Sequence, residues 1–402
     1  MSNTFMINTS NLLRLGLNLF IFNIFILHPL PTNAVTYNVQ TFGAKPDGGK
    51  TSSTKSLLKA WDIACKSVKP STIYVPPGTY LINQAVFSGP CKSKITFQID
   101  GTLVAPTNYY GVGNTGSWIL FNSVTGLTVL GGTIDAHGSG YWACKRSARN
   151  CPQGARSMLF TSSKNIVING LTSIDSQQAH LSFNGCENVM MKNLRIVAPE
   201  DSPNTDGIHV QMSNDVTITD SSIQTGDDCV SIGPGAKSIL IKRTGCGPGH
   251  GISIGSLARD FNEEGVQDIT VKNVTFNGSQ NGLRIKTWAR PSNGFVKNVI
   301  YQNIVMNDVL NPIIIDQNYC PGDKGCPNQN SGVKISGVTY QNIRGTSASP
   351  VAIKFQCSLT TPCSGIKLQN VKLTNFDHKP SQSVCLNAGG TALGLVSPRS
   401  CL

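Results

Sequence analysis

Apolar and polar residues alternate in short β-branched segments that recur along most of the chain. Successive segments begin 23, 27, 23, 30, 30, 39 and 28 residues apart, at Asn165, Asn188, Asp215, Ser238, Asp268, Asn298, Gly337 and Gly365. This alternation predicts half-buried strands. A repeat of about 20–30 residues with strands and turns, and no helices between them, predicts a parallel β-helix whose stacked coils share one core. A β-propeller would need about 40–45 residues per blade.

Each predicted coil has two further regular features. An Asn often lies five positions after the start of the repeat, at Asn193, Asn273, Asn303, Asn342 and Asn370. We expect these residues to stack at one corner, with the side-chain amide satisfying the backbone of the turn. A second apolar strand follows in each coil, at 207–210, 229–232, 251–254, 283–286 and 313–316. The predicted fold class is therefore all-β, with one solenoid domain over residues 35–402.

One segment departs from the strand pattern. Residues 51–65 place Leu57, Leu58, Trp61 and Cys65 at helical spacing, after Ser and Thr residues that are candidate helix caps. An amphipathic helix here would cover the open N-terminal end of the solenoid, where unpaired strand edges invite aggregation.

Composition and charge narrow the class of protein. Length alone suggests two or three domains in 402 residues, but one repeat in constant phase favours a single domain. With 39% hydrophobic and only 13% charged residues, the chain can bury a core and is not disordered. The formal charge of +12 permits a polyanionic partner. Nucleic acid is disfavoured, because no dense Lys/Arg run with interleaved aromatic residues occurs.

The N-terminus has the pattern of a secretory signal. An apolar run of 13 residues, 15–27, lies between Arg14 and the small residue Ala34. It is shorter than the roughly 20 residues that span a bilayer, and its flanks are typical of a signal peptide. We expect residues 1–34 to be removed, leaving a secreted mature chain 35–402 with charge +11, since only Arg14 is lost. A buried helix is the alternative, and no other segment predicts a membrane span.

The 13 cysteines all follow this segment, which suits an oxidising compartment. Sequence cannot prove connectivity, but CxxC and HxxxH spacings do not occur, so disulfides are favoured over zinc. Six pairs are close in sequence and leave Cys186 alone: Cys65/Cys91, Cys144/Cys151, Cys229/Cys246, Cys320/Cys326, Cys357/Cys363 and Cys385/Cys401. The last pair is expected to tie down the final turn. Asn273 and Asn277 begin glycosylation sequons.

Polar residues precede three of the second strands at equal spacing. Asp206, Asp228 and His250 are 22 residues apart, so one coil per step places them in a column with about 4.8 Å between neighbouring strands. On the next strand, Arg284 and Lys286 are two residues apart and therefore face the same way.

This column predicts acid–base chemistry. Asp206, Asp227 and Asp228 would repel one another, which pushes at least one pKa upward. A protonated carboxyl group can act as a general acid while an ionised neighbour activates water, and paired carboxylates of this kind hydrolyse glycosides. Arg284 and Lys286 could bind a substrate carboxylate, so the predicted substrate is an acidic sugar polymer. Turn chemistry explains any one of these motifs alone, and a calcium site is the alternative.

Four motifs in this order resemble the signature of plant-type polygalacturonases, pectin-hydrolysing enzymes of glycoside hydrolase family 28. They are Asn204-Thr205-Asp206, Gly226-Asp227-Asp228, Gly249-His250-Gly251 and Arg284-Ile285-Lys286. The resemblance covers residues 35–402 and includes the start at Tyr37. It implies a single-stranded, right-handed parallel β-helix of the pectin-lyase type and hydrolysis of α-1,4 bonds between galacturonic acid units with inversion, without a cofactor or metal.

The resemblance also implies residue roles. Asp227 would be the general acid, Asp206 and Asp228 would hold and activate the attacking water, and His250 would help set the protonation of the acid. Substrate binding is implied for Asn204, Arg284, Lys286 and Tyr319, and Asn204 would also position the carboxylates. Closely set carboxylates are typical of retaining enzymes, whereas the resemblance implies inversion, which we adopt as the expectation.

We therefore expect a monomeric, endo-acting enzyme of the cell wall whose partner is pectin or polygalacturonate, with no nucleic-acid or membrane partner. An exo-acting enzyme on the same fold would differ in its loops. A lyase would need calcium and would release an unsaturated product. A non-catalytic pectin-binding wall protein would be expected to have lost a motif carboxylate, and none is lost.

Overall fold

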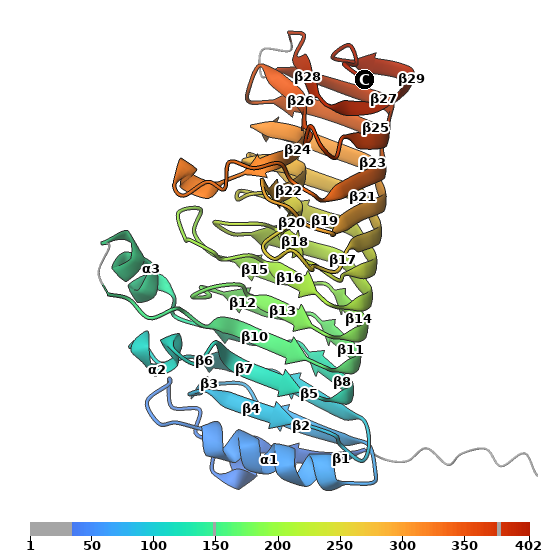
Figure 1. Cartoon of the computed structure of the whole chain (residues 1–402). Coiled ribbons are helices and arrows are strands. Elements are labelled where there is room, and N and C mark those ends of the chain that lie inside the picture. The colour runs from blue at the N-terminus through green and yellow to red at the C-terminus, as the bar shows by residue number, and fades with distance from the viewer. Residues whose placement is uncertain (1–33, 148–149, 376–378) are drawn as a thin grey trace, which may run out of the picture. The chain divides into compact units, whose positions relative to one another are not determined.

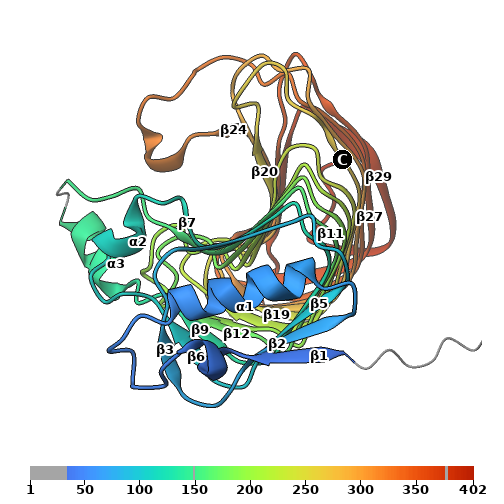
Figure 2. The ribbon, with the colours of Figure 1, turned by 90° about the horizontal axis from the view of Figure 1, so that it is seen from below.

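The computed structural model describes residues 34–147, 150–375 and 379–402. These residues wind into a right-handed parallel β-helix (Figures 1 and 2). The signal peptide predicted for residues 1–34 falls almost entirely outside the described residues. In the described ranges, no helix is both long enough and apolar enough to cross a bilayer.

One parallel sheet runs along a single side of the coils. In the described ranges it has 11 strands, and its register follows the repeat, so that Val210 pairs with Ile232 and Ile232 with Ile254. Its strands are β4 (Ala85–Ser88), β7 (Ser117–Asn122), β10 (Arg156–Thr161), β13 (Leu181–Asn184), β16 (Ile208–Gln211), β18 (Val230–Ile232), β20 (Ile252–Leu257), β22 (Asn281–Trp288), β24 (Asn311–Tyr319), β26 (Val351–Gln356) and β28 (Gln382–Leu386).

A second set of parallel strands wraps around the rest of each coil (Figure 2). In the first coils it is divided into short strands, and from β17 onward each coil has one long strand that bends. The strands are β1 (Val35–Asn38), β2 (Ser71–Val75), β3 (Thr79–Leu81), β5 (Ile95–Ile99), β6 (Thr102–Val104), β8 (Thr125–Leu130), β9 (Thr133–Asp135), β11 (Lys164–Asn169), β12 (Thr172–Ile174), β14 (Glu187–Lys192), β15 (Arg195–Val197), β17 (Asn214–Gln224), β19 (Lys237–Cys246), β21 (Val266–Asn277), β23 (Phe295–Val309), β25 (Lys334–Ser347), β27 (Cys363–Asn375) and β29 (Ala388–Ser397).

The recurring Asn marks the bend in these strands. Asn303 has a φ of 56°, Asn342 of 53° and Asn370 of 52°, a left-handed conformation that Asn, Asp and Gly adopt most readily. Their side chains form a ladder from coil to coil: Asn342 Nδ2 donates to Asn303 Oδ1 at 3.0 Å, and Asn303 Nδ2 to Asn273 Oδ1 at 3.1 Å. The prediction of a stacked corner is therefore correct, but the amides bind the neighbouring Asn rather than the turn backbone.

The predicted helix covers the N-terminal end of the solenoid as α1 (Thr54–Lys66) (Figure 2). Leu57 and Trp61 are buried, and the Trp61 ring lies 5.1 Å from that of Phe87. No Ser or Thr side chain caps the helix as the sequence suggested. The N-cap residue Ser53 instead accepts the Lys45 N–H with its Oγ at 3.0 Å, which fixes the preceding loop.

The core continues as a column of side chains from coil to coil. Phe87, Phe121, Phe160 and Phe183 stack with ring centroids 5.0, 5.1 and 4.8 Å apart. Because each ring occupies the same position of successive strands in the 11-stranded sheet, one residue type repeated in register fills the interior without gaps.

The expectation that no helices lie between the strands is wrong in two loops. The helices α2 (Tyr110–Gly113) and α3 (Ser139–Arg146) lie on the same side of the coils as the segment after β24, which contains a turn of 3₁₀-helix at Pro321–Asp323 (Figure 1). Another such turn lies at Val39–Phe42. Tyr141 and Trp142 of α3 bury in a small apolar cluster of their own, which stabilises a loop that the strand repeat does not predict.

The six proposed disulfides all form: Cys65–Cys91, Cys144–Cys151, Cys229–Cys246, Cys320–Cys326, Cys357–Cys363 and Cys385–Cys401. Cys186 is a buried free thiol. Cys385–Cys401 joins β28 to the segment after β29, so the predicted closure of the last turn is confirmed.

Candidate active site

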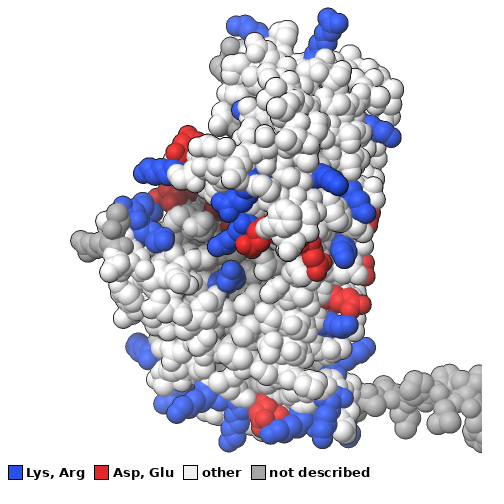
Figure 3. Space-filling view, viewed as in Figure 1, with Lys and Arg blue, Asp and Glu red and all other residues white. Residues whose placement is uncertain are grey.

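The four motifs lie on consecutive coils of the 11-stranded sheet. Three of them come just before β16, β18 and β20, and the fourth lies within β22. Gly207 N–H donates to Asp228 O at 2.8 Å, and His250 N–H donates to Asp227 O at 2.8 Å, so consecutive coils are in the predicted register. A cavity of about 700 Å³ opens there. Its lining includes Asn204, Asp206, Asp227, Asp228, Lys286 and Tyr319. In Figure 3, several Lys and Arg side chains lie in the middle part of the face shown, with Asp and Glu side chains among them.

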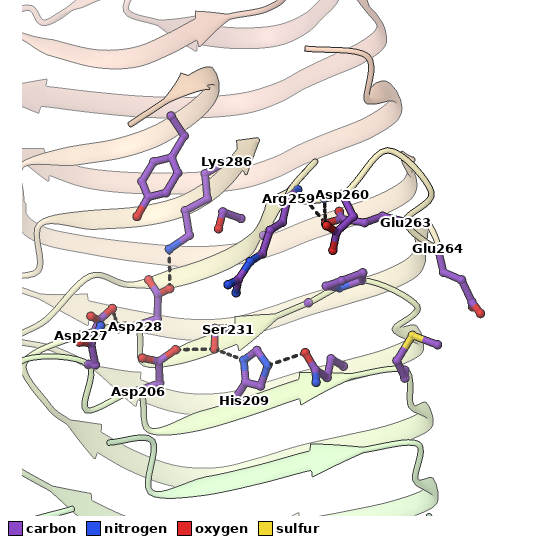
Figure 4. A pocket seen from close by; sticks show the side chains of 18 of the residues that line it. Asp206, His209, Asp227, Asp228, Ser231, Arg259, Asp260, Glu263, Glu264 and Lys286 are labelled. Atoms are coloured by element: carbon purple, nitrogen blue, oxygen red, sulfur yellow. Dashed lines mark hydrogen bonds and ion pairs between the residues drawn. The ribbon is translucent and has the colours of Figure 1, made fainter. Parts of the chain in front are cut away.

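Asp228 is held as an anion in the wall of the cavity. Its Oδ1 lies 2.7 Å from Arg284 Nη2 and its Oδ2 lies 2.9 Å from Lys286 Nζ (Figure 4 draws the second contact). Ser253 Oγ donates to Oδ1 at 2.7 Å. Burial acts to raise the pKa of Asp228, but the two cations and the hydrogen bonds outweigh it and hold the pKa below its ordinary value. Both bases are nine-tenths buried or more, so this is a closed ion-pair cluster.

Asp206 has the opposite electrostatic environment. Burial raises its pKa well above the ordinary value, and the charges of Asp227 and Asp228 raise it further. Ser231 Oγ lies 2.6 Å from Asp206 Oδ2, and this hydrogen bond together with the charge of Lys286 acts in the lowering direction. This is the behaviour predicted for one member of a crowded set of carboxylates.

Asp227 and His250 form the third part of the cluster. His250 Nδ1 lies 3.0 Å from Asp227 Oδ1, which also accepts the N–H of Asp228 at 2.7 Å. Equal spacing placed His250 in line with Asp228, but its side chain contacts Asp227, because Asp228 is turned towards Arg284 and Lys286. His250 also lines a second cavity, of about 390 Å³.

These contacts disfavour the calcium alternative. One ligand atom each of Asp227, Asp228 and His250 lies within 4.8 Å of the others. Both oxygens of Asp228 are already within hydrogen-bond distance of cationic groups. A calcium ion prefers oxygen ligands free of such charges, so this set fits the ion poorly.

Comparison with known proteins decides the family. Residues 65–398 match the family model described as Glycosyl hydrolases family 28. The chain belongs to glycosyl hydrolases family 28. It is therefore a glycoside hydrolase. It is 54% identical over 381 residues to a polygalacturonase from Prunus persica, covering 94% of this chain and 96% of that protein.

The chain is also similar to a protein named as an exo-acting enzyme and to a solved polygalacturonase structure. An exopolygalacturonase from Platanus acerifolia is 41% identical over 368 residues, covering 90% of this chain and 96% of that protein. The solved structure of a polygalacturonase from Erwinia carotovora ssp. carotovora superposes with a TM-score of 0.69 at 26% identity, covering 89% of this chain and 97% of that one. That solved structure therefore shares the parallel β-helix fold of this chain.

The remaining family motif residues take up different positions. Tyr319 is half-buried, with Lys286 Nζ 5.2 Å from its ring centroid and the Trp288 ring 5.4 Å away. Asn204 is exposed at the cavity with a φ of 57°. Arg284 lies behind Asp228, outside the residues that line the cavity, so in this structure it contacts the carboxylate cluster, and Lys286 is the base that lines the open space.

A second polar column lies beside the carboxylates and forms hydrogen bonds with them. The four motifs include only its last member, Arg284, and do not predict the others. His209, Ser231, Ser253 and Arg284 pair in register across β16, β18, β20 and β22. Arg284 Nε donates to Ser253 Oγ at 2.9 Å, and His209 Nδ1 lies 2.7 Å from Ser231 Oγ. The signal was present in the sequence, because His209, Ser231 and Ser253 are each the single polar residue of the segments 207–210, 229–232 and 251–254, and Arg284 takes the equivalent position in 283–286.

Glu263 lines the cavity of this family 28 enzyme but shapes a loop. Its carboxylate accepts the backbone N–H groups of Ala258, Arg259 and Asp260 at 2.6, 2.7 and 3.0 Å. Figure 4 shows it on the far side of Arg259 from Asp206 and Asp228. We therefore assign it to the wall of the cavity and not to the acid–base cluster.

Proposed function

We propose that the chain is a secreted, endo-acting polygalacturonase that hydrolyses α-1,4-galacturonosyl bonds of pectin in the cell wall. The observation that carries the endo assignment is the position of Asp227. Its side chain lines the 700 Å³ cavity, and His250, which contacts it, lines the 390 Å³ cavity. Space on both sides of the proposed acid suits a polymer that continues in both directions. Six disulfides and the predicted signal segment support secretion.

The electrostatics support separate roles for the three carboxylates. Asp227, flanked by His250, is the proposed general acid that protonates the leaving oxygen. Asp228, fixed as an anion by Arg284 and Lys286, would hold the attacking water, and Asp206 would take its proton. The raised pKa lies on Asp206, so Asp206 has to release its proton before it can accept one from the water, whereas Asp228 stays ionised and can hold the water throughout.

Substrate binding is proposed for the groups at the cavity surface. Lys286 and Tyr319 would contact a galacturonate carboxylate and ring, and Asn204 would position the sugar against the carboxylates. Arg284 would strengthen this contact through the ion-pair cluster. A long-lived contact with an acidic sugar would draw Lys286 partly away from Asp228.

The product profile on polygalacturonate tests the proposal. We expect mixed oligomers of galacturonate early in the reaction, with activity unchanged by a chelator and no unsaturated product absorbing in the ultraviolet. Release of monomer alone would show exo action, and an unsaturated product would show a lyase. Following the anomeric proton by NMR should reveal inversion, and a retained configuration would contradict the proposed roles.

Replacing the proposed acid gives the sharpest test of the roles. Asp227→Asn should lower kcat by about 10²- to 10⁴-fold, the usual contribution of a general acid, while binding of the polymer persists. Asp215→Asn, at an exposed coil corner, is the matched control and should retain wild-type turnover. Turnover near the wild-type rate in Asp227→Asn would overturn its assignment.

A further inference from the structure

A chain of hydrogen bonds leads from Asp206 away from the catalytic cluster. Asp206 Oδ2 lies 2.6 Å from Ser231 Oγ, which lies 2.7 Å from His209 Nδ1. On the other side of the imidazole, His209 Nε2 lies 3.2 Å from Gln211 Oε1. Figure 4 shows Asp206, Ser231 and His209 joined in this order by dashed lines.

Donor and acceptor types restrict how protons can occupy this chain. Gln211 Oε1 can only accept, so His209 carries a proton on Nε2. The Ser231 hydroxyl has one proton to donate. If it donates to His209 Nδ1, the short contact to Asp206 requires a protonated Asp206. If it donates to an anionic Asp206, His209 Nδ1 must carry a proton as well, and the imidazole is cationic.

The two arrangements differ only by two proton transfers. In the first, Asp206 and His209 are both neutral; in the second, Asp206 is an anion and His209 is a cation. The proton moves from Asp206 Oδ2 to Ser231 Oγ while the Ser231 proton moves to His209 Nδ1. No heavy atom has to move, the net charge is unchanged, and Gln211 accepts the Nε2 proton in both.

We propose that Ser231 and His209 form a proton relay that returns Asp206 to the anionic form able to accept a proton from the attacking water. Crowding by Asp227 and Asp228 favours a proton on Asp206, and a protonated Asp206 cannot activate water. The relay places a proton on His209 Nδ1, and the cationic imidazole then releases its Nε2 proton, which Gln211 Oε1 accepts, into the cavity that His209 and Gln211 both line. His209 is thus a positioning residue that acts through Ser231.

The surrounding groups weight the equilibrium towards the first, neutral arrangement, and a few of them act the other way. Burial lowers the pKa of His209, and Arg156 and Lys286 lower it further, while the hydrogen bond with Gln211 and the charge of Asp228 raise it. For Asp206, burial, Asp227 and Asp228 raise the pKa, while Ser231 and Lys286 lower it. These opposing effects act on both ends of one hydrogen-bonded chain.

A second Ser–His pair provides a matched control within the molecule. Ser173 Oγ lies 2.8 Å from His180 Nδ1, and both residues are fully buried. His180 Nε2 has no hydrogen-bond partner among the described residues, and burial lowers the pKa of His180 to about 3. Among the described residues no carboxylate forms a hydrogen bond with Ser173 or His180, so this pair has the same hydrogen bond without the relay.

The relay rests on the proposed function, so the test separates the two. Wild-type hydrolysis of polygalacturonate tests the function by itself. In Ser231→Ala, the acidic limb of kcat/KM against pH should move up by about one pH unit, because Asp206 loses a hydrogen bond that stabilises its anion. Ser173→Ala should leave the limb in place. An unchanged limb in Ser231→Ala, with wild-type hydrolysis intact, would overturn the relay.

Two further measurements exclude a purely structural role. His209→Ala should show the same shift, and added imidazole should reverse it; a raised KM with an unshifted limb would make His209 a substrate contact instead. In histidine-labelled protein, NMR titration should show a lower pKa for His209 in Ser231→Ala than in wild type, independently of turnover. An unchanged His209 titration would contradict the proposed coupling.

Discussion

Two polar columns run from coil to coil in this molecule, and their chemistry differs. At the bend of the long strands, each Asn amide donates to the amide of the preceding coil, as Asn342 does to Asn303. At the cavity, Asp206 and Asp228 occupy equivalent positions of adjacent coils, but a carboxylate only accepts. The first column is satisfied by its own members, and the second depends on donors from elsewhere.

This difference shows which side chains can be repeated in every coil and which need partners from outside the repeat. A side chain that both donates and accepts stabilises a stack of identical coils. A stack of carboxylates destabilises it unless Ser231, Arg284 and Lys286 supply protons and positive charge. That unequal supply gives Asp206 and Asp228 opposite pKa shifts on one scaffold.

The largest effect on stability is expected at Asp228. Asp228→Asn leaves Arg284 and Lys286 buried without their counter-charge, which should reduce the free energy of unfolding by about 3–5 kcal/mol. Because the pKa of Asp228 is depressed, its contribution is present at neutral pH and is lost as pH falls below the ordinary value of 3.8. Urea denaturation at pH 7 and pH 3 measures both points.

The matched control is the exposed pair of Asp220 and Arg243. Arg243 Nε lies 2.5 Å from Asp220 Oδ1, and this pair occupies two positions of the Asn column. Asp220→Asn should change stability far less than Asp228→Asn, because solvent screens the exposed pair. If Asp220→Asn and Asp228→Asn lost the same free energy of unfolding, burial would not be the reason for the stabilising effect of the Asp228 ion pairs.

Asp206→Asn should have the opposite effect on stability. The raised pKa means that wild-type stability falls as pH rises above 3.8, when the unfolded chain ionises before the folded one. The neutral amide removes this loss, so at pH 7 the variant should be more stable by roughly 1 kcal/mol per unit of raised pKa. The gain should vanish near pH 3, and hydrolysis should be lost. A variant less stable than wild type at pH 7 would contradict this.

The smallest change in stability is expected when an Asn of the corner ladder is replaced by Asp. Asn303→Asp removes the donor to Asn273 Oδ1 and should reduce the free energy of unfolding by about 1 kcal/mol at pH 7. The loss should be reversed below the pKa of the new carboxyl group, since its protonated form can donate again. Asn298→Asp should be the more destabilising of the two, because Asn298 donates to the carboxylate of Asp268 at 3.0 Å.

The solenoid could be predicted because its local rules repeat. The alternation of Val216 and Ile218 with Thr217 and Thr219, and the Asn that often lies five positions after a start, reflect backbone requirements that recur from coil to coil. Asn188, Asp215 and Asn298, which begin their repeats, have φ values of 54°, 56° and 56°. The sequence pattern therefore records the left-handed corners directly.

Side-chain partners were less predictable where neighbouring residues share a type. Spacing placed Asp227 and Asp228 together but did not tell which would face Arg284 and Lys286. That choice depends on which of two successive residues points away from the core. The helices α2 and α3 were also missed, because each occurs once and is stabilised by contacts of its own loop.

The short spans of the disulfides affect the order in which the chain can assemble. No bridge among the described cysteines spans more than 26 residues, and the shortest span 6. Each bridge therefore closes within roughly one coil and can form as that coil emerges, without waiting for a distant partner. A chain threaded from its N-terminus could oxidise in the order of synthesis, and Cys186, buried in the stack, would be withdrawn from exchange once its own coil had packed.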